Sequence, residues 1–423
     1  MNPAPVRPSS RPRAALVGAV ACTSLLLTSA CASDDDAATA PTSGGHLIVW
    51  ADDERALALM TFAESYSRTT GAQVEIVVVE NEELRSAFLD SHAGGLGPDI
   101  LVGPHDWTGE LVAAGAIAPV DLDPRADADL FTGGALDALT VDGRVYGIPY
   151  ATENLALLRN TDLAPDEPAT FEELVATGEA LVGSQGVERP LGLQVGEDGD
   201  AYHLHPLFTS AGGELFGSNT DGEPDPTDLR VDDPESIAAF ERLGELGEGG
   251  TGALTRKVDS GNAGRLFEEG RTPFLVSGPW SVAAIREAGV PYAVGPIPPF
   301  EDGGPARPLI GVQAFFLSSG AAEPELAARL ATDFTANPEF SVILYEADPR
   351  VPALMTALDV VAEQDPDLEE FQRAGELGTP MPAIPEMEAV WTPLSEAGAA
   401  VIGGADAEEQ ARLAADRIRS GFE

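Results

Sequence analysis

Aromatic and carboxylate side chains that could contact a ligand recur along this sequence. Asp200 precedes Tyr202 by two residues, and Trp280 follows a Gly-Pro step behind an apolar strand. Trp391 lies in a later helical segment. Aromatic rings stack on the C–H faces of sugar rings, and carboxylates are strong acceptors for hydroxyl groups. These residue types therefore suit a polyhydroxylated ligand, for which each unpaired hydroxyl would cost about 1–3 kcal/mol.

The same residues also have structural interpretations. Trp280 could cap the end of its strand, and Trp391 has the spacing of a core residue in its helix. Glu153 on its own is an ordinary polar residue. Tyr202 forms an aromatic and polar cluster with His203 that could be a surface cluster, although sugar-site chemistry favours Tyr202 as a ligand contact. The residues alone leave these alternatives open.

Motifs of enzymes and metal sites are not found. The chain has no Gly-x-Ser-x-Gly element, no His-Glu-x-x-His pair and no suitable cysteine nucleophile. A glycosidase interpretation would need to pair Glu153 with Asp106 or Asp200. The acidic stretch 219–228 does not match a calcium loop, and the 5 histidines lack a paired spacing. We predict no enzymatic activity, no metal and no cofactor, and keep a purely structural surface lipoprotein as an alternative.

The first residues have the features of an export signal. Arg7, Arg11 and Arg13 precede an uncharged, mostly apolar run over 14–30. This run is shorter than the roughly 20 residues of a membrane-spanning helix, which favours a signal peptide. We therefore expect the mature protein outside the cytoplasm.

Cys31 ends this segment in a context that resembles a bacterial lipoprotein signal, although Thr28 stands where leucine is usual. In such signals the cysteine is acylated. We expect a signal peptide over 1–31, lipidation of Cys31, a flexible tether over 32–45, and anchoring to the outer face of the bacterial cell membrane. Ordinary cleavage that leaves a free thiol is the alternative.

Charge and periodicity limit the partners and the fold. The formal net charge of −46 argues against nucleic acid and anionic lipid as partners. Apolar strands near 47–50, 74–79 and 100–102 alternate with helical segments, which predicts a largely parallel sheet. Because ligands bind beyond the carboxyl ends of such strands, residues 52–55 and 103–107 should lie at one rim.

An ordered set of motifs carries a family resemblance. The motifs are Leu47-Ile48-Val49-Trp50, Phe62-x3-Tyr66-x4-Gly71, Gly97-Pro98-Asp99-Ile100, Asp142-Gly143-x2-Tyr146-Gly147-Ile148-Pro149, Thr170-Phe171-Glu172-Glu173-Leu174 and Gly278-Pro279-Trp280. The set resembles extracellular solute-binding proteins of ATP-binding-cassette importers, and is most similar to maltose- and maltodextrin-binding proteins. The resemblance runs from about His46 to the C-terminus.

The resemblance implies a two-lobed, periplasmic-binding-protein-like α/β fold. Each lobe is expected to be a mostly parallel sheet flanked by helices, with hinge crossings near Thr152, Pro296 and Asp348. The N-terminal lobe would comprise 46–152 plus 298–348, and the C-terminal lobe 153–297 plus 349–423.

The resemblance also implies a set of ligand-binding residues. Those that match the sugar contacts of the maltose pattern are Glu54, Arg55, Asp106, Glu153, Asp200, Tyr202, Trp280 and Trp391. The sequence departs from the pattern at Gly103, where a tryptophan is usual, and at Thr392 and Ser395. Trp107 stands at an arginine position, and we include it as a nearby replacement for the lost platform.

The function implied is capture of a carbohydrate, expected to be maltose, a maltodextrin or a related α-glucoside, for delivery to the permease of an ATP-binding-cassette importer. The chain is expected to act as a monomer. The alternatives are a binding protein for a different oligosaccharide or small solute, and a secreted glycoside hydrolase.

Overall fold

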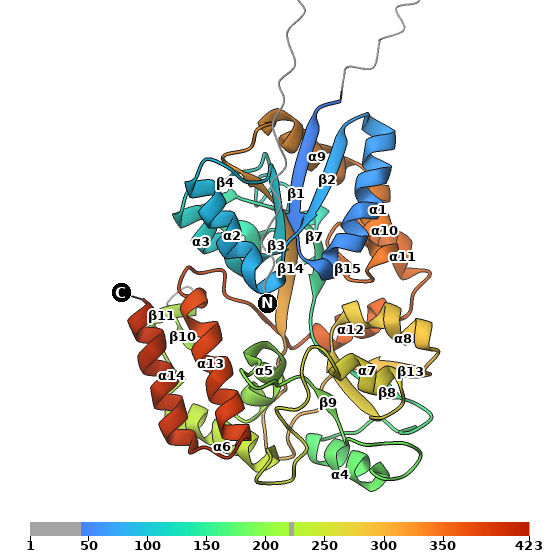
Figure 1. The fold of residues 1–423 in the computed structure, drawn as a ribbon, viewed down its shortest axis with the longest axis vertical. Coiled ribbons are helices and arrows are strands. Elements are labelled where there is room, and N and C mark those ends of the chain that lie inside the picture. Colours follow the sequence, from blue (N-terminus) through green and yellow to red (C-terminus); the bar gives the residue numbers. More distant parts are fainter. Residues whose placement is uncertain (1–43, 220–223, 423) are drawn as a thin grey trace, which may run out of the picture. The chain divides into compact units, whose positions relative to one another are not determined.

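The computed structural model describes residues 44–219 and 224–422. The predicted signal peptide with Cys31, and the tether up to residue 43, lie outside these residues. In the described part, a large sheet has the order β15-β7-β14-β3-β1-β2, with β4 and β16 also paired to β14 (Figure 1). Its strands are β1 (His46–Ala51), β2 (Gln73–Val78), β3 (Ile100–Pro104), β4 (Ile117–Ala118), β7 (Ile148–Glu153), β14 (Leu309–Ser318), β15 (Val351–Pro352) and β16 (Thr379–Pro380).

The first half of this sheet follows the predicted alternation of strands and helices. β1 pairs in parallel with both β2 and β3. Between them lie α1 (Asp53–Thr70) and α2 (Asn81–Ala93). Asp52 caps α1 by accepting a hydrogen bond from the backbone N–H of Arg55, and Gly71 ends it at φ 78°. An aspartate cap and a left-handed glycine are the expected ends of a helix.

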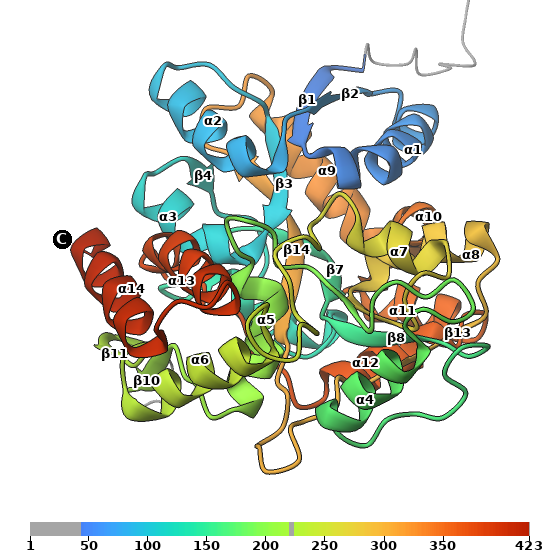
Figure 2. The same ribbon diagram turned by 60° about the horizontal axis from the view of Figure 1, so that its bottom comes forward.

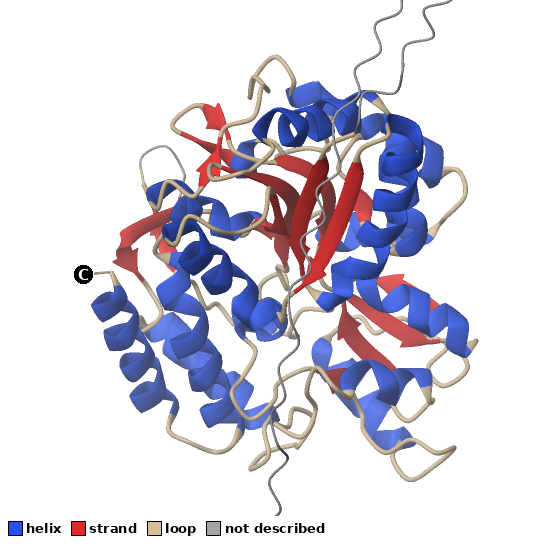
Figure 3. Cartoon of the chain, turned by 45° about the horizontal axis from the view of Figure 1, so that its top comes forward, coloured by secondary structure: helices blue, strands red, loops and turns tan. Residues whose placement is uncertain are grey.

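Helices cover both faces of the large sheet (Figure 3). One face packs on α1, α9 (Pro324–Ala336) and α10 (Pro338–Ala347), and the other on α2 and α3 (Thr108–Ala113). Neighbouring residues of β14 alternate between the faces: Phe315 joins the first core and Phe316 the second. This period of two, with both faces buried, explains why β14 is apolar along nearly its whole length.

A smaller sheet has the order β13-β8-β12-β9. Its strands are β8 (Ala156–Asn160), β9 (Gly192–Leu193), β12 (Phe274–Ser277) and β13 (Tyr292–Gly295). The helices in this part are α4 (Phe171–Leu181), α5 (Ala201–Ser210), α6 (Pro234–Leu246), α7 (Ala263–Glu268), α8 (Val282–Ala288), α11 (Met355–Ala362), α12 (Asp367–Gly375), α13 (Met387–Ile402) and α14 (Ala407–Gly421). In Figure 2, α13 and α14 lie beside α5 and α6.

Short elements complete the described part. The hairpins are β5 (Thr140–Val141) with β6 (Arg144–Val145), and β10 (Phe216–Ser218) with β11 (Pro224–Leu229). The 3-10 turns are η1 (His105–Trp107), η2 (Ala128–Leu130), η3 (Asp137–Leu139) and η4 (Pro279–Ser281). Asp142 and Gly143 both have positive φ, as a type I′ hairpin turn requires. Within the described ranges, no helix has the length and apolar character needed to cross a membrane.

The chain passes repeatedly between the two sheets. It leaves the large sheet at the end of β7, enters β8, and returns from β13 to β14. β14 is antiparallel to β3 and β7, and β8 is antiparallel to β12 and β13. The α/β class is confirmed, but the expectation of mostly parallel sheets is corrected. Parallel pairing of consecutive strands requires a crossover connection, usually a helix, over the same sheet. A strand that enters from the other sheet has no such crossover, so it can pair antiparallel to its neighbours.

Phe315 offers a test of the large core. Its side chain is 1% exposed, and its ring centroid lies 5.2 Å from that of Phe334 and 5.9 Å from that of Phe62. We expect Phe315→Ala to lower the free energy of unfolding by about 3–5 kcal/mol, because it leaves a cavity among packed rings. Denaturant titration would measure this. Leu413→Ala, on an exposed helix face, should change the free energy of unfolding by less than about 0.5 kcal/mol. Equal effects of the two substitutions would contradict the placement of Phe315 in the packed core.

Candidate ligand-binding site

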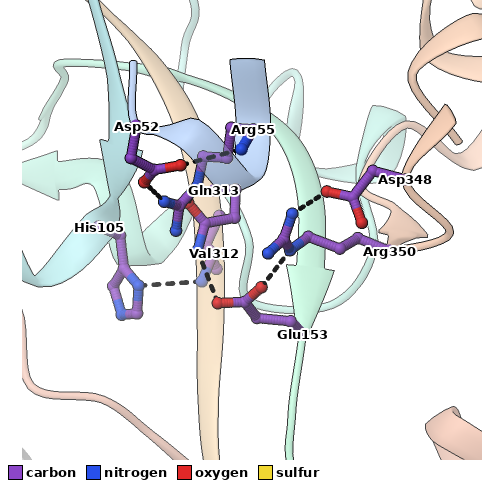
Figure 4. A network of polar contacts seen from close by, with 8 residues as sticks. All are labelled: Asp52, Arg55, His105, Glu153, Val312, Gln313, Asp348 and Arg350. Carbon is purple, nitrogen blue, oxygen red and sulfur yellow. Dashed lines mark hydrogen bonds and ion pairs between the residues drawn. The ribbon is translucent and has the colours of Figure 1, made fainter. Parts of the chain in front are cut away.

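A chain of buried ion pairs begins at the N-terminus of α1 (Figure 4). Arg55 forms an ion pair with Asp52, and its Nε donates to Oε1 of Gln313 on β14 at 2.9 Å. Burial, followed by the charge of Arg350, lowers the pKa of Arg55. Arg55 thus connects α1 to the centre of the sheet, and its donors are largely engaged within the protein.

Glu153 continues this chain from the last residue of β7. Its Oε1 accepts from Nε2 of Gln313 at 2.6 Å, and its Oε2 accepts from Nε of Arg350 at 2.6 Å. Arg350 also forms an ion pair with Asp348. Burial opposes ionisation of Glu153, but the charges of Arg350 and Arg55 outweigh it and hold the pKa below its ordinary value. Glu153 is therefore a buried carboxylate that stays ionised at the crossing.

Six residues join α1, β7, β14 and the segment before β15, and we call them the hinge network. They are Asp52, Arg55, Glu153, Gln313, Asp348 and Arg350.

His105 fixes the turn that follows β3. Its Nε2 donates to the carbonyl of Met381 at 2.8 Å, and its Nδ1 accepts from the backbone N–H of Val312 at 3.0 Å. An acceptor at Nδ1 requires the neutral ring. Burial lowers the pKa of His105 to about 4, consistent with that form. The turn that presents Asp106 is thereby attached to β14.

Asp106 lies against Trp391 of α13. Oδ2 of Asp106 accepts from Nε1 of Trp391 at 3.2 Å. Oδ1 is buried and has no hydrogen-bond partner in the described part of the chain. Burial raises the pKa of Asp106 to about 6, against the charge of Arg85 and the Trp391 bond. A buried acceptor without a partner is costly, and it is the kind of group that a ligand hydroxyl satisfies.

Tyr202 and Trp280 form an aromatic pair. Their ring centroids lie 6.5 Å apart, and His203 lies 5.5 Å from Tyr202 and 6.4 Å from Trp280. The hydroxyl of Tyr202 is buried and, among the described residues, has no hydrogen-bond partner. Burial raises the pKa of Tyr202 well above 10, and the charge of Glu153 raises it further.

The charges of Asp200 and Asp106 act on Tyr202 in the same direction, whereas that of Arg350 opposes them. Charged residues of β7, η1, the N-cap of α5 and the segment before β15 therefore all act on one phenol. This places two unpartnered polar groups, the Tyr202 hydroxyl and Asp106 Oδ1, in the same electrostatic environment.

Asp200 is engaged as the N-cap of α5. It accepts from the backbone N–H and from Nδ1 of His203, both at 2.9 Å, and from Nε2 of Gln194 at 2.6 Å. Oγ of Ser395 accepts from the N–H of Ala201 at 3.0 Å. Ser395, one of the departures from the maltose pattern, therefore supports the first turn of α5.

Trp107 lies mostly in the core. Its side chain is 8% exposed and packs with Leu101 and Leu111. A Cβ at Gly103 would lie 2.3 Å from Cζ3 of Trp107. The indole thus occupies the space that a side chain at position 103 would need, which explains why glycine and tryptophan occur together here. Little of the ring remains for a ligand.

The structure brings most of the predicted residues together. Arg55 and Glu153 lie in the hinge network, Asp106 contacts Trp391, and Tyr202 lies beside Trp280. The side chain of Glu54 lies outside the described residues. No group of three or more His, Cys, Asp or Glu side chains in the described chain is placed to hold a metal.

Three residues that position the site were missed from sequence. They are His105, Gln313 and Arg350. His105 immediately precedes the predicted site residue Asp106, so its neighbourhood gave a weak signal. Gln313 and Arg350 have no local motif, because their role depends on strands that are distant in sequence.

Comparisons with known proteins bear on the family of the chain. The family model described as "Bacterial extracellular solute-binding protein" matches residues 61–373. The chain is 28% identical over 410 residues to the galactooligosaccharide-binding protein of Bacillus subtilis, covering 92% of both chains. It is 28% identical over 359 residues to the maltotriose-binding protein of Pyrococcus abyssi, covering 83% of this chain and 76% of that protein.

A solved structure also resembles the fold. The maltotriose binding protein of Thermus thermophilus, bound with maltotriose, has a TM-score of 0.81 and 26% identity, covering 89% of this chain and 100% of that one. The predicted resemblance and two-lobed α/β fold are confirmed, while the site residues and the bounds of the two lobes remain predictions.

Asp106 gives a pH-dependent test. Its pKa of about 6, against an ordinary 3.8, means that the folded protein holds this proton more tightly. The group therefore favours folding near pH ~4 and opposes it as the pH rises through about 6. The difference corresponds to about 3 kcal/mol. We expect Asp106→Asn to raise the free energy of unfolding by up to about 3 kcal/mol at about pH 7.5, with the gain vanishing near pH ~4.

Denaturant titrations at both pH values would measure this. Asp416→Asn, on the exposed side of α14, serves as the control for removing one negative charge. An equal gain at both pH values would show that burial of the Asp106 carboxylate is not the cause.

Gly103 gives a packing test. We expect Gly103→Ala to lower the free energy of unfolding by about 1–3 kcal/mol, because the new methyl group collides with a packed indole. When Gly103→Ala is combined with Trp107→Phe, the loss of free energy of unfolding should be smaller than the sum of the losses in the two single variants. Gly133→Ala, where a Cβ meets nothing within 4 Å, is the matched control. Additive costs at positions 103 and 107 would refute the predicted contact.

Proposed function

Because the chain belongs to the bacterial extracellular solute-binding protein family, we propose that it captures a carbohydrate outside the cytoplasm and delivers it to an ATP-binding-cassette importer. The observation that carries this proposal is a pair of buried polar atoms, Asp106 Oδ1 and the Tyr202 hydroxyl, which have no hydrogen-bond partner among the described residues and lie beside aromatic rings. Ligand hydroxyls would satisfy both atoms, and sugar ring faces would stack on the aromatic side chains.

The residues have distinct roles in this proposal. Trp280, Trp391 and Tyr202 would supply most of the stacking energy, because aromatic side chains bury the most apolar area. Asp106 would bind a hydroxyl through its free oxygen. Glu153 is already bonded in the hinge network, but each carboxylate oxygen has more than one lone pair and can accept again.

Asp200 would act similarly, since its oxygens also carry further lone pairs beyond the cap of α5. Arg55 would hold Glu153 through Gln313 in addition to any hydroxyl it contacts. Trp107 would contribute at most an edge, because it is largely buried. Glu54 is carried only by the resemblance.

The preferred sugar is proposed to be maltose, a maltodextrin or another α-glucoside. The maltotriose-binding relatives support this choice. The galactooligosaccharide-binding relative supports the alternative of a different oligosaccharide. Gly103 and Ser395 depart from the maltose pattern: Gly103 makes room for a packed indole, and Ser395 supports α5. The contacts that the pattern makes to long sugar chains at these two positions would therefore be lost.

The proposed cycle is closure of two lobes around the sugar. The lobes would comprise 46–152 with 298–348, and 153–297 with 349–423. A ligand that contacts both favours the closed form by its differential affinity. The importer would recognise the closed, monomeric protein and hydrolyse ATP itself. Acylated Cys31 would hold the protein at the outer face of the cell membrane through the tether over 32–45.

The family is one of non-enzymatic binding proteins, and the chain is not an enzyme. Incubation with maltotriose should therefore release no reducing ends above background. Turnover would instead support the glycoside hydrolase alternative.

Calorimetry would test the ligand. We expect the chain without residues 1–31 to bind maltose or maltotriose. Trehalose, cellobiose and a galactooligosaccharide are titrated separately as alternative ligands. Trp280→Ala should weaken binding by about 10- to 100-fold, because it removes a stacking surface. Trp50→Phe, at the end of β1, is the control and should leave affinity within about twofold.

The outcomes separate two levels of the proposal. Binding of the galactooligosaccharide alone would refute the α-glucoside assignment and leave carbohydrate capture intact. Absence of binding by every sugar in the panel would refute carbohydrate capture.

A further inference from the structure

Arg350 belongs to the hinge network and also lies near Trp280 of the aromatic pair. Its side chain is 2% exposed. Its Nε donates to Glu153 at 2.6 Å, and it forms an ion pair with Asp348. Its guanidinium carbon also lies 5.5 Å from the centroid of the Trp280 ring. One buried cation therefore links two carboxylates at the crossing to an indole of the candidate sugar site.

From these contacts we propose that Arg350 is a positioning residue that couples the orientation of Trp280 to closure of the hinge. This inference rests on the proposed function, in which Trp280 stacks on the sugar. No ligand contact is required of Arg350 itself. Its effect is transmitted through Glu153 on one side and Trp280 on the other.

The first step is the place of Arg350 in the chain. It immediately precedes β15, whose residues Val351 and Pro352 pair with Thr152 and Ala151 of β7. Glu153 follows on β7, at the point where the chain leaves the large sheet for β8. The bond between Arg350 and Glu153 thus joins two adjacent strands at the crossing. A rotation about this crossing must either carry Arg350 along or break a buried ion pair.

The second step is the packing of Trp280. A Cβ at Gly278 would lie 2.0 Å from Cζ3 of Trp280, so the indole folds closely against the Gly278 backbone. Tyr202 and His203 approach it at 6.5 and 6.4 Å. Arg350 adds a charged contact from outside η4. Because guanidinium groups are attracted to the face of an indole, a shift of Arg350 would shift the preferred position of the ring.

The third step is the choice of arginine. Its planar group can bond two carboxylates and lie near an aromatic ring at once, whereas a lysine ammonium is a compact charge. The charge of Arg350 also reaches Tyr202, whose pKa it lowers against the effect of Glu153. The same group therefore acts on both members of the aromatic pair. Charge alone would not hold all of these contacts in one geometry.

Arg350→Lys tests the proposal while keeping the charge that Glu153 and Asp348 require. We expect dissociation of maltotriose, or of whichever sugar the wild-type protein binds, to become about tenfold faster in stopped-flow fluorescence, with association within about twofold. Closure would be less stable because the indole is no longer held by the hinge. An unchanged dissociation rate would overturn the proposal.

A double-mutant cycle distinguishes positioning from a general structural role. In the Trp280→Leu background, Arg350→Lys should change sugar dissociation by less than about threefold, because the residue that transmits its effect is absent. An equal effect in both backgrounds would refute transmission through Trp280. Phe334→Leu, in the large core, is the matched control: it should lower the midpoint of denaturation without changing sugar dissociation.

A measurement without sugar keeps this inference separate from the proposed function. The same four proteins, wild type, the two single variants and the double variant, should show coupling between positions 350 and 280 in denaturant unfolding of the ligand-free protein. Absence of coupling would overturn the contact. If no sugar bound the wild type but coupling were present, the proposed function would fail while the contact between Arg350 and Trp280 would stand.

Discussion

The burial of charge at the crossing between the two sheets is the constraint on which the site depends. An ionised group removed from water is unfavourable unless it is paired and hydrogen-bonded. Glu153 meets this condition through Gln313 and Arg350, and Arg55 meets it through Asp52 and Gln313. Since these partners come from separate elements, satisfying the charges also fixes how α1, β7 and β14 meet. The polar network is therefore part of the architecture and also borders the proposed ligand site.

At two places near the candidate site, the indole of a tryptophan packs directly against a glycine. After β3, the indole of Trp107 covers Gly103, and after β12 the indole of Trp280 folds against Gly278. In each case any side chain on the glycine would displace a ring. The outcomes differ because Trp107 is absorbed into a core, whereas Trp280 remains partly exposed beside Tyr202. A tryptophan near a strand end can therefore be buried in a core or remain partly exposed, and the sequence motif does not distinguish the two cases.

Local signals predicted the local structure well. The strands near 47–50, 74–79 and 100–102 follow from sequence because each depends on a few neighbouring apolar residues. The ordered motifs predicted the family. The sequence did not reveal that β14 pairs with both β3 and β7, a pairing that decides where Gln313 lies. Its partner residues are roughly 160 to 220 positions apart in the chain. Arg350 was missed for the same reason, since its partner Glu153 is remote in sequence.

Asp106 shows what distinguishes a ligand site from the structural network next to it. Glu153 has two bonded oxygens and a lowered pKa, so the fold itself stabilises its charge. Asp106 has one bonded oxygen, one without a partner in the described chain, and a pKa raised to about 6. The fold thus does not fully compensate for the burial of the Asp106 carboxylate. The nearby Tyr202 hydroxyl also lacks a hydrogen-bond partner among the described residues. Leaving both groups unpaired lowers the stability of the fold, and a hydroxyl-bearing ligand that bonded to both would recover that free energy on binding.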